Sequence, residues 1–176
     1  MNSFESALVV MAPEAEPIVK SFRDRFDPVA ALGMPAHITV LYPFIPPDGV
    51  DRRVLKQLAQ LFATHRRFEY TLAEASLFPD VLYLHPEPAD PFRALTRDVH
   101  AHFPEFPPYR GAYSDIVPHL TLAQAAGAND LESIAAEFSA TTGMLLPVRA
   151  EAAEIALVDN STGRWRVTRT FALATS

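Results

Sequence analysis

Apolar residues along the chain follow two periods, which predict an alternation of strands and helices. An unbroken apolar run predicts a buried strand over 6–11. Apolar residues that recur every three or four positions predict helices over 14–27, from Asp48 to Phe62, over 90–103 and over 130–139. β-rich or alternating segments predict the remaining strands over 36–41, 68–77, 81–84, 119–123, 148–158 and 165–174.

The order of these predicted elements repeats in the two halves of the chain. Each half contains a helix, a short strand with the sequence His-x-Thr, a second helix and two further strands. Seven prolines fall between residues 79 and 108, which predicts short elements and loops that form a hinge between the halves. We therefore predict an α+β fold in which two pseudo-twofold-related lobes face one another, within a single domain over 1–176.

Composition and charge narrow the class of protein. With 49% hydrophobic and 20% charged residues, the 176-residue chain can form a substantial core. The absence of cysteine excludes disulfides and thiolate chemistry and suits a reducing, cytoplasmic location. The early apolar stretch over 7–12 is far shorter than a membrane span, so we expect no membrane association, and we expect a monomer.

The net charge of −6 is spread evenly over both halves of the chain. Long nucleic acid held through its phosphates needs a positive surface, which this balance does not provide. A short nucleotide or an RNA end remains compatible with the charge. We therefore expect a small nucleotide or RNA-end substrate as the partner.

Two His-x-Thr strands carry the candidate chemistry. Residues i and i+2 of a strand point to the same face, so His37 and Thr39 share one face, and His119 and Thr121 share another. Their neighbours are apolar and belong to the core. A pseudo-twofold axis would bring the two polar faces together across a cleft.

Two histidines and two threonines are suited to phosphoryl transfer without a metal. Opening a cyclic phosphodiester needs a base for the attacking water and an acid for the departing oxygen. An imidazole with a pKa near 6.5 can fill either role near neutral pH. The threonine hydroxyls would donate hydrogen bonds to the non-bridging oxygens.

The segments His37-Ile38-Thr39-Val40 and Pro118-His119-Leu120-Thr121-Leu122 resemble the two motifs of the 2H phosphoesterase superfamily, which includes bacterial 2′-5′ RNA ligase and 2′,3′-cyclic phosphodiesterase proteins. The resemblance implies two antiparallel sheets with helices outside, around a central cleft. It implies that both histidines are catalytic and that both threonines bind phosphate. It also implies action on 2′,3′-cyclic phosphates or 2′-5′ linkages of RNA ends or small nucleotides, by hydrolysis or by reversible ligation.

Four residues near the motifs are candidates for substrate binding. Tyr42 and Phe44 follow the first motif, where either could stack on a base or could pack against the adjacent prolines. Arg110 and Tyr113 lie in the loop over 105–118 before the second motif. That loop is either a substrate-binding loop or a solvated connection.

Two competing interpretations stay open at this point. One is a nucleotide-binding module that has the same cleft but no turnover, although binding alone needs no acid and base on opposite sides. The other is a histidine-metal hydrolase. Its candidate ligands, His100 and His102, diverge on a predicted helix, so we expect no metal and no cofactor.

Overall fold

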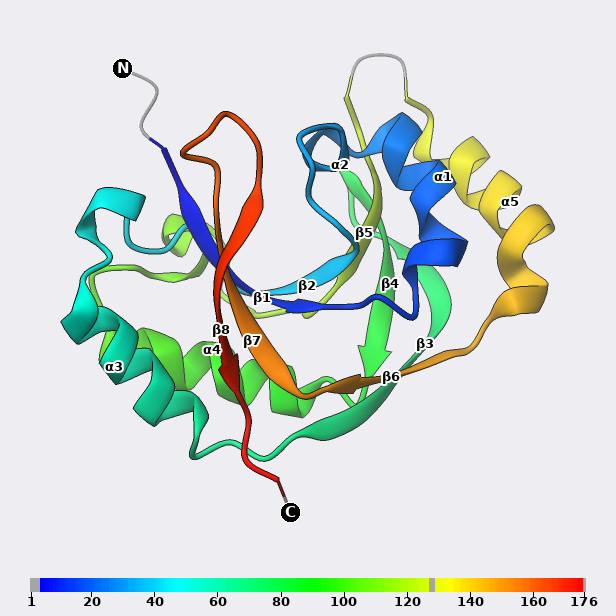
Figure 1. Ribbon diagram of the computed structural model, residues 1–176. Coiled ribbons are helices and arrows are strands. Elements are labelled where there is room, and N and C mark those ends of the chain that lie inside the picture. The colour runs from blue at the N-terminus through cyan, green and yellow to red at the C-terminus, as the bar shows by residue number, and fades with distance from the viewer. Residues whose placement is uncertain (1–3, 127–128, 176) are drawn as a thin grey trace.

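The computed structural model describes residues 4–126 and 129–175 and places their strands in two four-stranded sheets (Figure 1). Every neighbouring pair of strands is antiparallel. The first sheet has the order β2 (His37–Leu41), β1 (Ser6–Met11), β7 (Glu154–Asp159), β8 (Arg166–Ala172). The second has the order β5 (Leu120–Gln124), β4 (Val81–Glu87), β3 (Phe68–Leu77), β6 (Val148–Ala152).

Helices lie on the outer sides of the two sheets (Figure 1). One group, α1 and α5, packs against the second sheet, and α3 and α4 pack against the first. The α-helices are α1 (Glu16–Phe26), α2 (Pro28–Ala31), α3 (Arg52–Phe62), α4 (Asp90–His102) and α5 (Leu131–Thr142), and short 3₁₀ turns are η1 (Pro47–Gly49), η2 (Pro108–Gly111) and η3 (Gly143–Leu145). The predicted α+β class with two antiparallel sheets is confirmed.

The predicted division of the chain into halves does not match the division into sheets. β7 and β8 pair beside β1, whereas β3 and β4 pair beside β5, so each sheet contains strands from both halves. The true repeat is strand, helix, His-x-Thr strand: β1-α1-β2 and β4-α4-β5. Each repeat packs its helix on the other repeat's motif strand, with α1 against β5 and α4 against β2.

Three local predictions were wrong. The apolar residues on both sides of Ala153 suggested one strand over 148–158, but the chain there leaves one sheet as β6 and enters the other as β7. The cap of α3 is Asp51, whose side chain accepts from the Val54 amide at 2.9 Å, while Asp48 lies within η1. The proline-rich segment over 79–108 is not a hinge of short elements, because β4 and α4 occupy most of it.

Helix α4 illustrates how the sequence positions a motif strand. Pro91 in its first turn is preorganised for a helix, and Phe92, Leu95 and Val99 form a stripe that is at most 1% exposed. Burial of each such side chain contributes about 1.5–3 kcal/mol. The buried Thr96 hydroxyl on the same side donates to the Val40 carbonyl at 2.7 Å, which fixes β2 against the helix.

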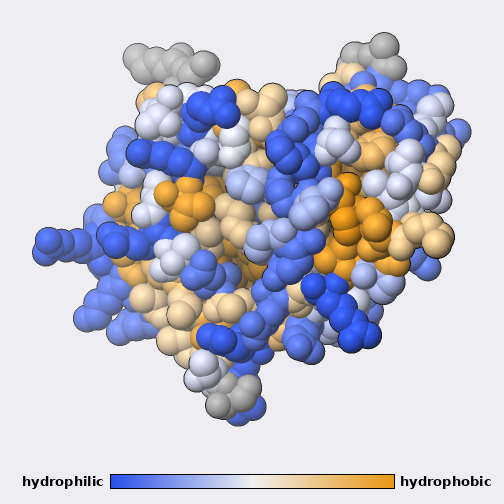
Figure 2. All heavy atoms as spheres, turned by 45° about the vertical axis from the view of Figure 1, so that its right-hand side comes forward, coloured by the Kyte–Doolittle hydropathy of each residue, from blue (hydrophilic) through white to orange (hydrophobic). Residues whose placement is uncertain are grey.

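The two faces of β1 belong to different apolar clusters. Leu8 and Val10 of β1 face the helices and join the main core. The alternate residues Ala7 and Val9 face the other way and form a smaller apolar cluster with neighbouring strands. The face of the molecule shown in Figure 2 is mixed, with hydrophilic residues around separate apolar patches. Among the described residues, no helix is long and apolar enough to cross a membrane.

Candidate active site

The two motif strands, β2 and β5, are the edge strands of different sheets and lie side by side in the middle of the molecule (Figure 1). In β2, His37 and Thr39 are half-buried, while Ile38, Val40 and Leu41 are buried. In β5 Thr121 is half-buried between buried leucines, and His119 immediately precedes the strand. All four motif side chains line one cleft of about 340 Å³. The tertiary structure thus brings the two predicted faces together.

Matching irregularities accompany both motifs. The register of β1 with β2 shifts between Leu8 and Val9, and Val9 lies opposite Thr39. The register of β4 with β5 shifts between Leu82 and Tyr83, and Tyr83 lies opposite Thr121. Bulges of this kind redirect side chains and are frequent beside active sites. Their pseudosymmetric positions give both threonines equivalent places at the cleft.

Each histidine is oriented by a backbone carbonyl two residues before it. The Nδ1 atom of His37 lies 2.8 Å from the Pro35 oxygen, and the Nδ1 atom of His119 lies 2.7 Å from the Val117 oxygen. A carbonyl oxygen only accepts, so Nδ1 carries the hydrogen in both rings. The neutral rings therefore keep Nε2 as the free acceptor, which is the atom available for proton transfer.

Burial favours the neutral form of both imidazoles in the free protein. It lowers the pKa of His37 from its ordinary value of 6.5 to about 4, against the opposing effect of the Pro35 carbonyl. The positive charges of Arg23 and His119 lower it further. Burial also lowers the pKa of His119, again opposed by its carbonyl partner Val117. Although an edge of each ring remains accessible, protein atoms surround most of it.

Aromatic rings enclose His119. Phe78 and Tyr83 meet it edge-on, with ring centroids at 6.1 and 5.8 Å. Tyr109 stacks on it with centroids 6.5 Å apart and planes 24° from parallel. These contacts restrict the ring to one orientation and help to desolvate it.

The loop that carries Tyr109 has an unusual backbone. Tyr109 and Arg110 are both left-handed, with φ of 50° and 57°, which costs about 1–2 kcal/mol for each residue with a side chain. The Tyr109 amide donates to the Tyr42 carbonyl at 2.6 Å. Glu5 accepts from the Arg110 guanidinium at 2.9 Å and from the Tyr42 hydroxyl at 2.7 Å. The loop before β5 is thereby attached to the strand that carries the first motif.

The four predicted binding residues have different positions. Tyr42 lines the cleft and meets Trp165 edge-on. Arg110 projects outward, 73% exposed, in its ion pair with Glu5. Tyr113 is 66% exposed and reaches the site only through its edge contact with Tyr109, at a centroid distance of 5.6 Å.

Phe44 requires a correction. Its side chain is 2% exposed and is not among the residues that line the cleft. It packs edge-on against Phe103 and Phe106 in the main core. Burial in a cluster of aromatic rings stabilises the fold there and leaves no free face for a base.

A buried ion pair beside the cleft was missed by the sequence analysis. Arg23 and Asp27 are 2% and 0% exposed at their side chains and lie 2.9 Å apart. Arg23 also donates to the Met34 carbonyl, and Gln124 of β5 donates to Asp27. Burial raises the pKa of Asp27, although the charge and hydrogen bonds of Arg23 act in the opposite direction. This network joins α1 to the second motif strand, and the spacing of Arg23 and Asp27 on a helix was its only signal.

One wall of the cleft is apolar. It is formed by the inner face of the first sheet and its neighbours, namely Ala7, Val9, Val29, Met34 and Trp165. Such a surface is suited to a base or to the apolar edge of a ribose. Trp165 is the one tryptophan of the chain, and the sequence analysis placed it at the start of a strand without a role.

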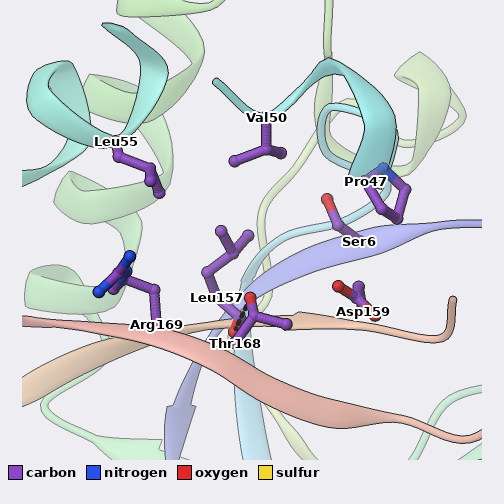
Figure 3. A pocket seen from close by; sticks show the side chains of 8 residues that line it. All are labelled: Ser6, Pro47, Val50, Leu55, Leu157, Asp159, Thr168 and Arg169. Atoms are coloured by element: carbon purple, nitrogen blue, oxygen red, sulfur yellow. Dashed lines mark hydrogen bonds between the residues drawn. The ribbon is translucent and has the colours of Figure 1, made fainter. Parts of the chain in front are cut away.

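A second cavity, of about 200 Å³, lies on the helix-covered face of the first sheet and contains none of the motif residues (Figure 3). Its polar side chains mostly have partners within the fold. Ser6 donates to the Ile45 carbonyl and Thr168 to the Leu157 carbonyl. The candidate catalytic side chains all lie in the other cleft, between the motifs. Within 4–126 and 129–175, no three histidine or acidic side chains are grouped as metal ligands.

A family model and several solved structures match most of the chain. A model of the 2′-5′ RNA ligase superfamily matches residues 11–164. No curated protein matches the chain. Solved structures with the same fold include Escherichia coli LigT complexed with NADP⁺, at 18% identity and a TM-score of 0.59 over 99% of both chains. The protein TT0787 of Thermus thermophilus has 18% identity and a TM-score of 0.62 over 98% of this chain and 99% of that one. LigT complexed with 3′-AMP has 18% identity and a TM-score of 0.60 over 96% and 97%.

Proposed function

The chain belongs to the 2′-5′ RNA ligase superfamily, and from this we propose that it is a metal-independent phosphoesterase for 2′,3′-cyclic phosphate or 2′-5′ phosphodiester bonds of RNA ends or small nucleotides. The observation that carries the proposal is the presence of both motifs in one cleft. Each imidazole is fixed at Nδ1, which leaves Nε2 free. The cleft therefore supplies two groups that can exchange protons with a phosphate between them.

In hydrolysis of a cyclic phosphate, one neutral imidazole accepts a proton from water as the water oxygen bonds to phosphorus. The bond from phosphorus to the 2′ or 3′ oxygen breaks, and the other imidazole, as imidazolium, gives its proton to that oxygen. In the reverse direction the two histidines exchange roles. Thr39 and Thr121 donate hydrogen bonds to the non-bridging oxygens and stabilise the charge that develops there.

The surroundings of the motifs support a nucleotide substrate. The apolar wall with Trp165 can accept a base, and Tyr42 lies at the same cleft. Solved complexes of LigT contain NADP⁺, 3′-AMP and ATP. The chain is acidic, with a net charge of −6, so recognition depends on the reacting phosphate and few others.

The test is a turnover assay with 2′,3′-cyclic AMP and with a 2′-5′-linked dinucleotide, in the presence and absence of EDTA. We expect His37→Asn and His119→Asn each to reduce turnover by about 10²–10⁴-fold, with activity unaffected by EDTA. His102→Asn is a matched control, because this exposed histidine also bonds a carbonyl through Nδ1 but lies on α4.

Three outcomes would contradict the proposal. Nucleotide binding without turnover by the unchanged protein would indicate a binding module. Loss of activity in EDTA with recovery in zinc or manganese would indicate a metal hydrolase. Full activity of either motif variant would remove that histidine from the mechanism.

A further inference from the structure

Tyr109 lines the cleft together with the four motif side chains. Its ring stacks on the His119 imidazole, with centroids 6.5 Å apart. Its side chain lines the same cleft as Thr39 of the other motif strand. The side chain therefore lies at the cleft beside His119, while its backbone is bonded to the residue that follows the first motif strand.

A strained backbone conformation places the Tyr109 side chain at the cleft. Tyr109 and Arg110 adopt the left-handed conformation without being glycine. The Tyr109 amide is held by the Tyr42 carbonyl, and the Arg110 side chain by Glu5. Strained residues that the surrounding structure fixes are typical of functional sites, where a side chain must be presented in one direction.

The chemical setting suits a hydrogen-bond donor. Burial raises the pKa of Tyr109 to about 12, so the phenol stays protonated at physiological pH. A protonated phenol has one hydrogen to donate. Thr39 lines the same cleft and is assigned to the non-bridging oxygens, so a phosphate held by Thr39 would lie in the cleft that Tyr109 also lines.

We propose that Tyr109 is a further phosphate-binding residue, whose hydroxyl donates to a non-bridging oxygen of the substrate beside Thr39. The inference rests on the proposed function, since it assigns the reacting phosphate to this cleft. With Tyr109 added to Thr39 and Thr121, the site has three hydroxyl donors for the phosphate. It also explains why the loop before β5 is attached to the first motif strand through Tyr42 and Glu5.

The test compares Tyr109→Phe with the unchanged protein. The variant keeps the ring that stacks on His119 and removes only the hydroxyl. Because the lost hydrogen bond is to a charged group, we expect kcat/KM for 2′,3′-cyclic AMP to fall about 10- to 100-fold. The inhibition constant of inorganic phosphate should rise at the same time.

Tyr70→Phe is the matched control. Tyr70 is 3% exposed on β3, and its hydroxyl has no partner among the described residues, so its removal costs no hydrogen bond. It lies outside the cleft that holds the motifs. We expect this variant to keep both the turnover and the phosphate inhibition of the unchanged protein.

Two results would overturn the inference about Tyr109. Unchanged kcat/KM and phosphate inhibition in Tyr109→Phe would mean that the hydroxyl does not contact phosphate. A rise in kcat/KM would mean that the tyrosine obstructs the cleft. Failure of the proposed function is distinguishable, because in that case the unchanged protein itself would not turn over any of the substrates.

Discussion

Raising the pH from about 6 to about 9 is expected to reduce kcat/KM for a 2′,3′-cyclic nucleotide steadily, by about tenfold for each pH unit. Acid–base catalysis by two imidazoles needs one of them neutral and the other protonated. In the free protein, burial lowers the pKa of His37 to about 4 and the pKa of His119 below its ordinary 6.5. The singly protonated form is therefore most abundant in acidic solution, above the pKa of His37 and below that of His119.

The magnitude follows from the same values. With a pKa of about 4, His37 is protonated in about one molecule in a thousand at pH 7, so His119 supplies most of the imidazolium. A bound phosphate adds negative charge beside both rings and raises both pKa values. The optimum of kcat should consequently lie at higher pH than the optimum of kcat/KM.

Two measurements check this prediction. Initial rates at constant ionic strength give the two pH profiles, and NMR titration of the imidazole signals gives the pKa values directly, with His37→Asn to assign one signal. A flat or rising kcat/KM above pH 6.5 would refute the reasoning. An NMR pKa of His37 at or above its ordinary 6.5 would refute it independently of activity.

The lowered pKa of His37 also makes the free energy of unfolding depend on pH. In the unfolded chain His37 binds a proton near pH 6.5, but in the folded chain only near pH 4. The stability that comes from the neutral folded ring is complete above pH 6.5 and is lost as the pH falls toward 4. Urea unfolding over this range should show that His37→Asn has a weaker dependence on pH than the unchanged protein.

Two further predictions concern the buried ion pair and the number of bound phosphates. Asp27→Asn leaves the Arg23 charge buried without its partner, and should lower the free energy of unfolding in urea by about 3–5 kcal/mol. Asp24→Asn, at the exposed pair with Lys20 on the same helix, is the control and should have no measurable effect, so equal losses would contradict this account. The affinity for a short oligonucleotide should depend weakly on salt, with a logarithmic slope of about −1.4 for two phosphates, and a slope equivalent to five or more would reveal a basic surface that the net charge conceals.

Local patterns account for most of the elements. The three- and four-residue spacing in α4 and the alternation in β2 depend only on which face of an element is buried, and both were predicted correctly. The pattern of apolar residues gave a wrong prediction at the junction of β6 and β7. The adjacent Ala152 and Ala153 interrupt the alternation, but two small apolar residues do not show that the chain passes there from one sheet to the other.

The sequence by itself determined the chemistry of the motif strands, because the two-residue period of a strand places His37 with Thr39 on one face wherever that strand lies. Only the tertiary structure decided that β2 and β5 meet as edge strands of different sheets, and which other side chains reach the cleft. Tyr109 lies at the cleft because its left-handed backbone is held by a hydrogen bond to Tyr42, far away in the chain. Phe44 does not line the cleft, because it packs among aromatic rings in the core. Both outcomes depend on contacts between segments far apart in the chain, and a local pattern contains no information about such contacts.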